Sequence, residues 1–219
     1  IVLKKNEESN SKHNDLLKLF AMLTMLIDHI GYLFFPNILL FRTIGRMAFP
    51  IFAYQLSIGY SKTSNLRNYI IRLFIFGLIT YIPYSFFNPK LKFNPFKLNI
   101  LFTLGISLIF IYLYNQAKNH FNKFIEKKDL KYMLISIISI IFMFFILIFD
   151  NQLSTFFPRG GLEYGAYGIL LVLIFHLFKD KPIKLIISFI ILNFGYAFNY
   201  HLIYLETKSL SNILLIFFN

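Results

Sequence analysis

Cysteine is absent from this 219-residue chain, and charged residues make up only 15% of it. A chain without thiols forms no disulfide, no cysteine-ligated zinc site and no cysteine nucleophile. The low charge accompanies 57% hydrophobic and 20% aromatic residues, far more than a soluble domain of this size carries. These values exclude an ordinary water-soluble enzyme and indicate a membrane protein.

Two common catalytic patterns are also missing. The five histidines include no pair at metal-ligand spacing on a helix, so the sequence predicts no metal site. No serine lies in a nucleophile-elbow context, so covalent hydrolase chemistry is not expected. Because no fixed-period repeat or domain linker is visible either, we expect a single membrane domain over residues 1–219.

Apolar runs recur along the whole chain, separated by short basic stretches. Runs of roughly 17–25 apolar residues are long enough to cross a bilayer as helices. The first run holds Asp28 and His29 and is too long for a cleavable signal peptide, so we expect it to remain. The sequence therefore predicts an all-α, polytopic bundle of seven or eight spans in the cell membrane, at 16–35, 38–60, 68–87, 98–115, 131–149, 164–178 and 184–200, with an eighth run near 209.

The charge pattern predicts the orientation of this bundle. With a cytoplasmic N-terminus, the polar segment 1–15 and the basic loop 116–130 face inward, together with most of the 22 lysines and arginines. The stretch 88–97 departs from this rule, because it places Lys90, Lys92 and Lys97 outside. The formal net charge of +12 is therefore expected to set topology and contact anionic lipid of the bilayer rather than nucleic acid.

Four ionisable residues lie inside the first two apolar runs: Asp28, His29, Arg42 and Arg46. Such a group costs at least about 2.5–3.5 kcal/mol in the hydrocarbon region, so it requires a partner, a wet cavity or a function. At 1.5 Å per residue, Asp28 and His29 lie about 11 Å below the outer surface, Arg42 about 6 Å and Arg46 about 12 Å. The short turn at Pro36 makes the two helices antiparallel neighbours, so we expect the four side chains to converge.

This cluster has two interpretations. Asp28 and one arginine could form a buried salt bridge that only fastens the first two helices together. One ion pair needs one arginine, however, and the surplus arginine and a histidine suited to general-base work near neutral pH favour chemistry.

Other polar residues are expected near the same outer surface. Asn99 and Thr103 share one face at the start of a predicted helix, and the glycine-rich stretch 159–168 carries Glu163, Tyr164 and Tyr167. Glycines there allow a ligand to approach the backbone closely, although a flexible connection would use them equally well.

Several ordered sequence blocks lie within about residues 16–178. They are Leu17 to Gly31 with Asp28-His29, Arg42-Thr-Ile-Gly45-Arg46 followed by Phe49-Pro50, Tyr69 to Gly77 with Ile82-Pro83, Asn99 to Gly105, and Glu163-Tyr164-Gly165-Ala-Tyr167-Gly168. Together these blocks resemble the TraX family of membrane proteins. Glu163 stands where that family is expected to have aspartate.

The resemblance implies a membrane-bound N- or O-acetyltransferase that uses acetyl-CoA, since the namesake of the family is associated with N-acetylation of a pilin subunit. The acceptor would be a peptide, glycan or lipid. Three roles follow. His29 would be the general base, Asp28 would orient it or fix an arginine, and Arg42 or Arg46 would stabilise the oxyanion or a donor phosphate. Glu163, Tyr164, Tyr167, Asn99 and Thr103 would bind substrate, and Lys62, Arg67 and Arg72 would hold the CoA phosphates.

Two other classes of function stay open at this point. A transporter or flippase would use the arginines to bind an anionic substrate, with Asp28 and His29 as proton relay. A membrane scaffold without catalytic activity would use the buried charges only to hold helices together.

Overall fold

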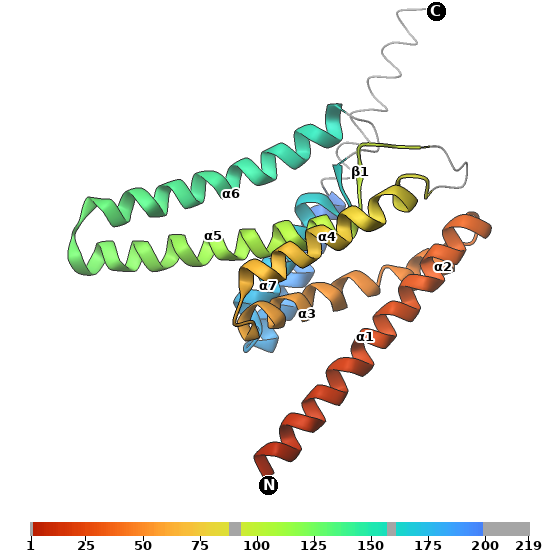
Figure 1. Ribbon diagram of the computed structural model, residues 1–219, viewed down its shortest axis with the longest axis horizontal. Helices are drawn as coiled ribbons and strands as arrows, with labels where there is room; N and C mark the ends of the chain where they lie inside the picture. The colour runs from red at the N-terminus through yellow and green to blue at the C-terminus, as the bar shows by residue number, and fades with distance from the viewer. Residues whose placement is uncertain (1, 88–92, 157–160, 199–219) are drawn as a thin grey trace, which may run out of the picture. The chain divides into compact units, whose positions relative to one another are not determined.

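The computed structural model describes residues 2–87, 93–156 and 161–198, and it divides into two compact units, 1–176 and 177–219. Figure 1 shows the elements of the chain. In chain order they are α1 (Val2–Phe34), α2 (Leu39–Gly45), α3 (Ala48–Lys62), α4 (Leu66–Ser85), β1 (Lys97–Leu98), α5 (Ile100–Lys127), α6 (Leu130–Phe156), β2 (Gly161–Leu162) and α7 (Gly165–Phe178). The described part of the second unit contains a further apolar helix, Pro182–Phe198.

The prediction of an all-α fold is confirmed. Four helices of the described chain are long and apolar enough to cross a bilayer, namely Asn14–Phe34, Leu66–Ser85, Ile100–Lys127 and Leu130–Gln152. The helices Gly165–Phe178 and Pro182–Phe198 are apolar but shorter. The total of seven or eight spans and the cytoplasmic N-terminus stay predictions.

The second predicted span, 38–60, is divided into two helices. At the end of α2 the amides of Arg46 and Met47 bond back to the carbonyls of Arg42 and Ile44, and α3 begins at Ala48. Pro50 lies in the first turn of α3, where its missing N–H removes no intrahelical hydrogen bond. A proline there explains why the apolar run restarts as a new helix instead of continuing α2.

The prediction of a loop at 116–130 is wrong. α5 continues to Lys127 and α6 starts at Leu130, so only two residues connect them. Residues 116–127 contain neither glycine nor proline, and they include several good helix formers. Lys128 caps the end of α5: it has a φ of 55° and donates its amide to the carbonyl of Phe124. The polar segment 1–15 is likewise helical from Val2, as the start of α1.

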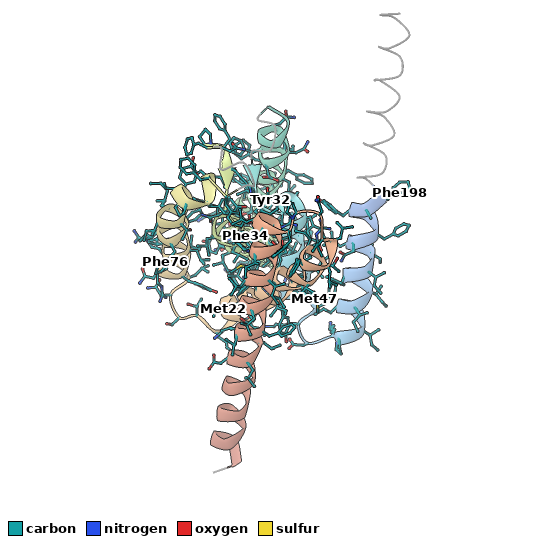
Figure 2. The ribbon with its side chains drawn as sticks, turned by 90° about the vertical axis from the view of Figure 1, so that its right-hand side faces the viewer. Met22, Tyr32, Phe34, Met47, Phe76 and Phe198 are labelled. Atoms are coloured by element: carbon teal, nitrogen blue, oxygen red, sulfur yellow. The ribbon has the colours of Figure 1, made fainter. Side chains whose placement is uncertain are left out.

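The core of the first unit lies around α5. Buried residues of this helix include Thr103, Leu108 and Ile111. Phe49 of α3 and Val172 of α7 are also buried, and both Phe49 and Thr103 closely approach Gly168 of α7. In contrast, α1, α4 and α6 expose many large apolar side chains. Met22 and Phe34 of α1, Phe76 of α4, and Met47 just before α3 are labelled in Figure 2, and each is more than half exposed. Such a surface fits a lipid environment.

Two glycines allow close contact between α1 and α2, which pack directly against each other (Figure 1). A Cβ atom at Gly45 would overlap the side chain of Asp28, and a Cβ atom at Gly31 would overlap the side chain of Phe41. The contact therefore requires glycine at both positions, and the charged side chain of Asp28 lies in it.

We predict that Gly45→Ala lowers the thermal stability of the purified protein in detergent. The added methyl group must displace Asp28, and overpacking of this kind costs about 1–3 kcal/mol. Gly195→Ala is the matched control, because no atom lies within 4 Å of a Cβ placed there in the helix Pro182–Phe198. A melting temperature for Gly45→Ala equal to that of Gly195→Ala would contradict the close contact.

Candidate active site

A polar pocket lies at the end of the bundle where α1 and α4 end and α7 begins. Its volume is about 240 Å³. The pocket is lined by Asp28, His29, Tyr32, Arg42, Tyr84, Phe87, Lys97, Gly161, Leu162 and Glu163. Residues from distant parts of the sequence are thus brought together, and they include two acids, two permanent or near-permanent cations and one imidazole.

Asp28 and Arg42 form an ion pair within this pocket. The Nη1 atom of Arg42 donates to Oδ2 of Asp28 over 2.8 Å, and the side chains are 38% and 19% exposed, respectively. The Arg42 guanidinium also lies 4.9 Å from the ring centroid of Tyr32. The charged residues of α1 and α2 therefore converge as predicted in the case of Asp28 and Arg42. The same ion pair is also the contact that a purely structural role would require.

The geometry of His29 determines which ring nitrogen is available as a base. Nδ1 lies 2.6 Å from the backbone carbonyl oxygen of Met25. A carbonyl oxygen only accepts hydrogen bonds, so Nδ1 must carry the proton in this contact. In the neutral imidazole, Nε2 then keeps the lone pair that a general base needs.

Three aromatic rings form one wall of the pocket. Phe87 contacts His29, Tyr32 and Tyr84, with ring centroids 4.6, 5.5 and 6.3 Å apart. The ammonium group of Lys97 lies over the ring of Tyr84, 4.6 Å from its centroid, and 5.9 Å from that of Tyr32. The faces of these aromatic rings therefore help to stabilise the ammonium group of the partly buried Lys97.

Backbone hydrogen bonds hold Glu163 at the pocket. β1 and β2 pair in parallel with Lys97 opposite Gly161, and the amide of Glu163 donates to the carbonyl of Leu98 over 3.2 Å. The hydroxyl of Thr103 donates to the carbonyl oxygen of Glu163 over 2.6 Å. This short ladder joins the start of α5 to the start of α7 and places the Glu163 side chain near Lys97.

The surroundings of Glu163 oppose its ionisation. Burial raises the pKa of its carboxyl group, while Tyr84, Lys97 and His29 counteract part of this effect. The buried hydroxyl of Tyr84 lies near this carboxyl group, outside regular hydrogen-bond geometry. Burial also lowers the pKa of Lys97, which Glu163 partly offsets. Burial thus disfavours the charged form of both side chains relative to water.

Asp150 supports the segment that carries Glu163. This buried residue near the end of α6 accepts hydrogen bonds from the amides of Leu162, at 3.2 Å, and Ala166. Between them, Tyr164 has a φ of 64°, which is rare for a bulky residue, and its ring stacks on Phe49 at 3.9 Å. A strained backbone next to a buried acid is typical of a functional site.

The other predicted site residues are distributed around this pocket. Arg46 is exposed and does not line it, although its charge acts on Tyr164. Asn99 is buried, begins α5 by accepting from the amide of Leu101, and donates to the carbonyl of Gly77 over 2.8 Å. Thr103 holds the Glu163 backbone, and Tyr167 is partly buried in α7 without lining the pocket.

The three basic residues predicted to hold phosphates lie toward the opposite end of α3 and α4. Lys62 lines a groove of about 430 Å³ and Arg72 lines a neighbouring one of about 500 Å³. Both grooves include Tyr69, whereas Arg67 is exposed and lines neither. Lys18 of α1 also lines the first groove.

Sequence reasoning missed five residues of this site: Tyr32, Tyr84, Phe87, Lys97 and Asp150. Two of these residues could have been identified from the sequence. Lys97 belongs to the basic stretch that departs from the positive-inside pattern, and Asp150 is a carboxylate directly after the apolar run 131–149. The three aromatic residues could not be identified, because the sequence contains 29 phenylalanines and 14 tyrosines.

These features define a class of protein: a helical membrane protein with a charged, partly buried pocket at one end of its bundle. The family model described as TraX protein matches residues 13–216, which is nearly the whole chain. The chain therefore belongs to the TraX family.

Two similar proteins cover only part of this chain. An uncharacterized protein of Rickettsia prowazekii (strain Madrid E) is 30% identical over 115 residues, which are 52% of this chain and 42% of that protein. A probable fimbrial assembly protein FimC, serogroup H1, of Dichelobacter nodosus is 30% identical over 104 residues, or 42% of this chain and 43% of that protein. The chain thus spans about two fifths of these curated relatives, and no solved structure matches it.

We predict a pH-dependent difference in stability between the wild type and Glu163→Gln. The folded state binds the Glu163 proton more tightly than the unfolded state, because its pKa is raised above the ordinary value of 4.5. The contribution of the protonated Glu163 carboxyl group to the stability of the folded state is therefore lost as pH rises above 4.5. The two melting temperatures should agree below that pH, and the wild type should fall below the variant toward neutral pH. A constant difference would contradict the raised pKa.

We further predict that Asp150→Ala accelerates amide hydrogen exchange at Leu162 and Ala166. Two backbone donors lose their acceptor, at a cost of about 1–3 kcal/mol, which corresponds to roughly 5–150-fold faster exchange by local opening. Asp150→Asn keeps one acceptor oxygen and should show a smaller effect. Equal protection in Asp150→Ala and the wild type would show that the carboxylate does not hold this segment.

Proposed function

We propose that this chain is a membrane acyltransferase that moves an acetyl group from acetyl-CoA to an amine or hydroxyl of a membrane-associated or exported acceptor. The family and the fimbrial-assembly name of one relative support a peptide acceptor of the pilin kind, with glycans and lipids as the other acceptors. The protein would act in the cytoplasmic membrane as a multi-pass enzyme. The observation that carries the proposal is the shared pocket of His29, the Asp28–Arg42 pair and Glu163.

His29 is the proposed general base. Its Nε2 atom would take the proton of the acceptor N–H or O–H as that nitrogen or oxygen attacks the thioester carbon. A new carbon–nitrogen or carbon–oxygen bond forms, the carbon–sulfur bond then breaks, and the thiolate of CoA leaves with a proton returned from the imidazolium. The contact of Nδ1 with Met25 keeps the ring in the tautomer that this step requires.

Arg42 is the proposed stabiliser of the oxyanion in this transfer. A guanidinium aimed into a partly dry pocket stabilises developing negative charge more strongly than it would in water. Asp28 holds that guanidinium in place through the 2.8 Å ion pair and is therefore a positioning residue. Glu163 lies beside Lys97 and Tyr84, where it would bind and orient the acceptor group.

The acetyl-CoA donor would enter from the end of the bundle that carries Lys62 and Arg72. Lys18 and Asp28 are ten residues apart on α1, so this groove lies about 15 Å from the pocket along the helix axis. The phosphates would remain among the basic residues, and the flexible arm of the donor would cover that distance. Arg67, which lines neither groove, would contribute through its exposed charge.

A scaffold function is the second candidate, because the Asp28–Arg42 ion pair is present as that function requires. It leaves His29, Glu163 and Lys97 without a role in the same pocket. A salt bridge that only joins α1 to α2 needs no titratable groups from α1, β1 and the start of α7.

To test the proposal, inside-out membrane vesicles containing the protein are supplied with acetyl-CoA labelled in the acetyl group. Peptides, glycans and lipids are then separated and counted. We expect labelled acceptor with the wild type, and a loss of at least about 100-fold with His29→Ala, the usual size of a general-base contribution. Arg42→Gln should lose more activity than Arg46→Gln, since Arg42 lines the pocket and Arg46 does not.

His120→Ala serves as the matched histidine control, because His120 lies near the far end of α5 against Tyr132. It should transfer acetyl groups like the wild type. Full activity in His29→Ala would remove the proposed base. Transport of an anionic substrate without any labelled acceptor would favour the transporter, and neither activity would favour the scaffold.

A further inference from the structure

A second, apolar groove lies between α5, α6 and α7, away from the charged pocket. Its volume is about 530 Å³. α5 contributes residues from Phe110 to Phe121, α6 contributes residues from Ser136 to Leu147, and α7 closes one side with Leu170 and Leu173. The proposed acyltransferase mechanism does not use this groove.

The length of the groove matches the depth of one membrane leaflet. Its lining covers eleven residue steps on both α5 and α6, which is about 16 Å of helix. Half of the hydrocarbon core of a bilayer is about 15 Å deep. The hydroxyl of Ser136 donates to the carbonyl of Ala117, so the Ser136 end of the groove is the end nearest the α5–α6 connection.

The lining of the groove suits a hydrocarbon chain. Apart from Lys118 and the hydroxyls of Tyr114 and Ser136, the lining side chains are apolar, and the Ser136 hydroxyl already donates to the Ala117 carbonyl. A hydrocarbon chain needs no hydrogen-bond partner from such a surface.

Charge is concentrated at one end only. Lys118 is the charged residue among the groove's lining residues, and it lies at the end near the α5–α6 connection. It is exposed, and the ion pairs formed by the described side chains do not include it. An apolar slot of leaflet depth with an unpaired ammonium group at its mouth is complementary to an anionic lipid.

We propose that this groove binds one acyl chain of an anionic phospholipid from the leaflet next to the α5–α6 connection, with the phosphate of the headgroup at Lys118. The lipid fills the space between α5 and α6 that the side chains leave open. This inference does not depend on the acetyl-transfer reaction.

The absence of tryptophan from the chain allows a direct test. Phe144→Trp places a single tryptophan in the groove, and Phe145→Trp places one at a neighbouring position of α6 that does not line it. Both native side chains are more than half exposed, so the substitutions are matched. Each variant is reconstituted in nanodiscs with phospholipids brominated in the acyl chain, which quench tryptophan fluorescence, carrying either a phosphatidylglycerol or a phosphatidylcholine headgroup.

We expect the Phe144→Trp fluorescence to be quenched by brominated phosphatidylglycerol with an apparent affinity about five-fold above that of phosphatidylcholine, the effect of one lysine near anionic lipid. Adding Lys118→Gln should remove this preference. Lys131→Gln is the control for charge, because Lys131 lies just beyond the same connection without lining the groove. Phe145→Trp should be quenched equally by both lipids. Leu147→Trp, one turn along the groove, is a second reporter if Phe144→Trp does not fold.

Equal quenching of Phe144→Trp and Leu147→Trp by the two lipids would overturn the proposal, as would a headgroup preference that survives Lys118→Gln. Quenching at position 145 but not in the groove would show that protein fills it, from a second copy or another helix of this chain. That result would also overturn the proposal. Loss of acetyl transfer in the earlier experiment leaves these readouts unchanged, so the two proposals fail independently.

Discussion

The cost of placing charge in a low-dielectric environment governs the arrangement of α1 and α2. Each ionised side chain at membrane depth costs about 2.5–3.5 kcal/mol or more, so Asp28 is stable there only with a partner. Arg42 supplies it across the helix–helix contact, and Gly45 makes room for the Asp28 side chain. The geometry of the pocket follows, because this contact fixes the positions of His29 and Tyr32, one and four residues after Asp28.

The far side of the pocket depends on backbone hydrogen bonds instead of helix packing. Glu163 is held by the β1–β2 ladder, by Thr103 and, through its neighbours, by Asp150. Burial makes the ionised form of Glu163 unfavourable, so the fold loses stability by keeping an acid at this position. Retaining a destabilising group near an imidazole and a lysine is the pattern expected where activity and stability conflict.

The sequence was sufficient for the long helices and for the meeting of α1 with α2, because apolar length and a short turn determine both. It predicted correctly that Asp28, His29, Arg42 and Glu163 lie close together, since charges in apolar runs are conspicuous, whereas Arg46 lies outside the pocket. It did not predict the break at Met47 or the helical course of 116–127, because local capping and helix propensity override hydropathy there. Tyr32, Tyr84 and Phe87 could not be selected, since aromatic residues in an aromatic-rich chain look alike until tertiary contacts are known.

The Asp28–Arg42 pair joins residues only 14 positions apart, so it can form as soon as the first two helices have emerged from the ribosome. A hairpin that neutralises its own charges can partition from the translocon into lipid as a unit, without waiting for later segments. Glu163 is synthesised long afterwards, with β2 and the start of α7. Nascent chains arrested before that point would therefore be membrane-integrated yet lack the acid that completes the pocket.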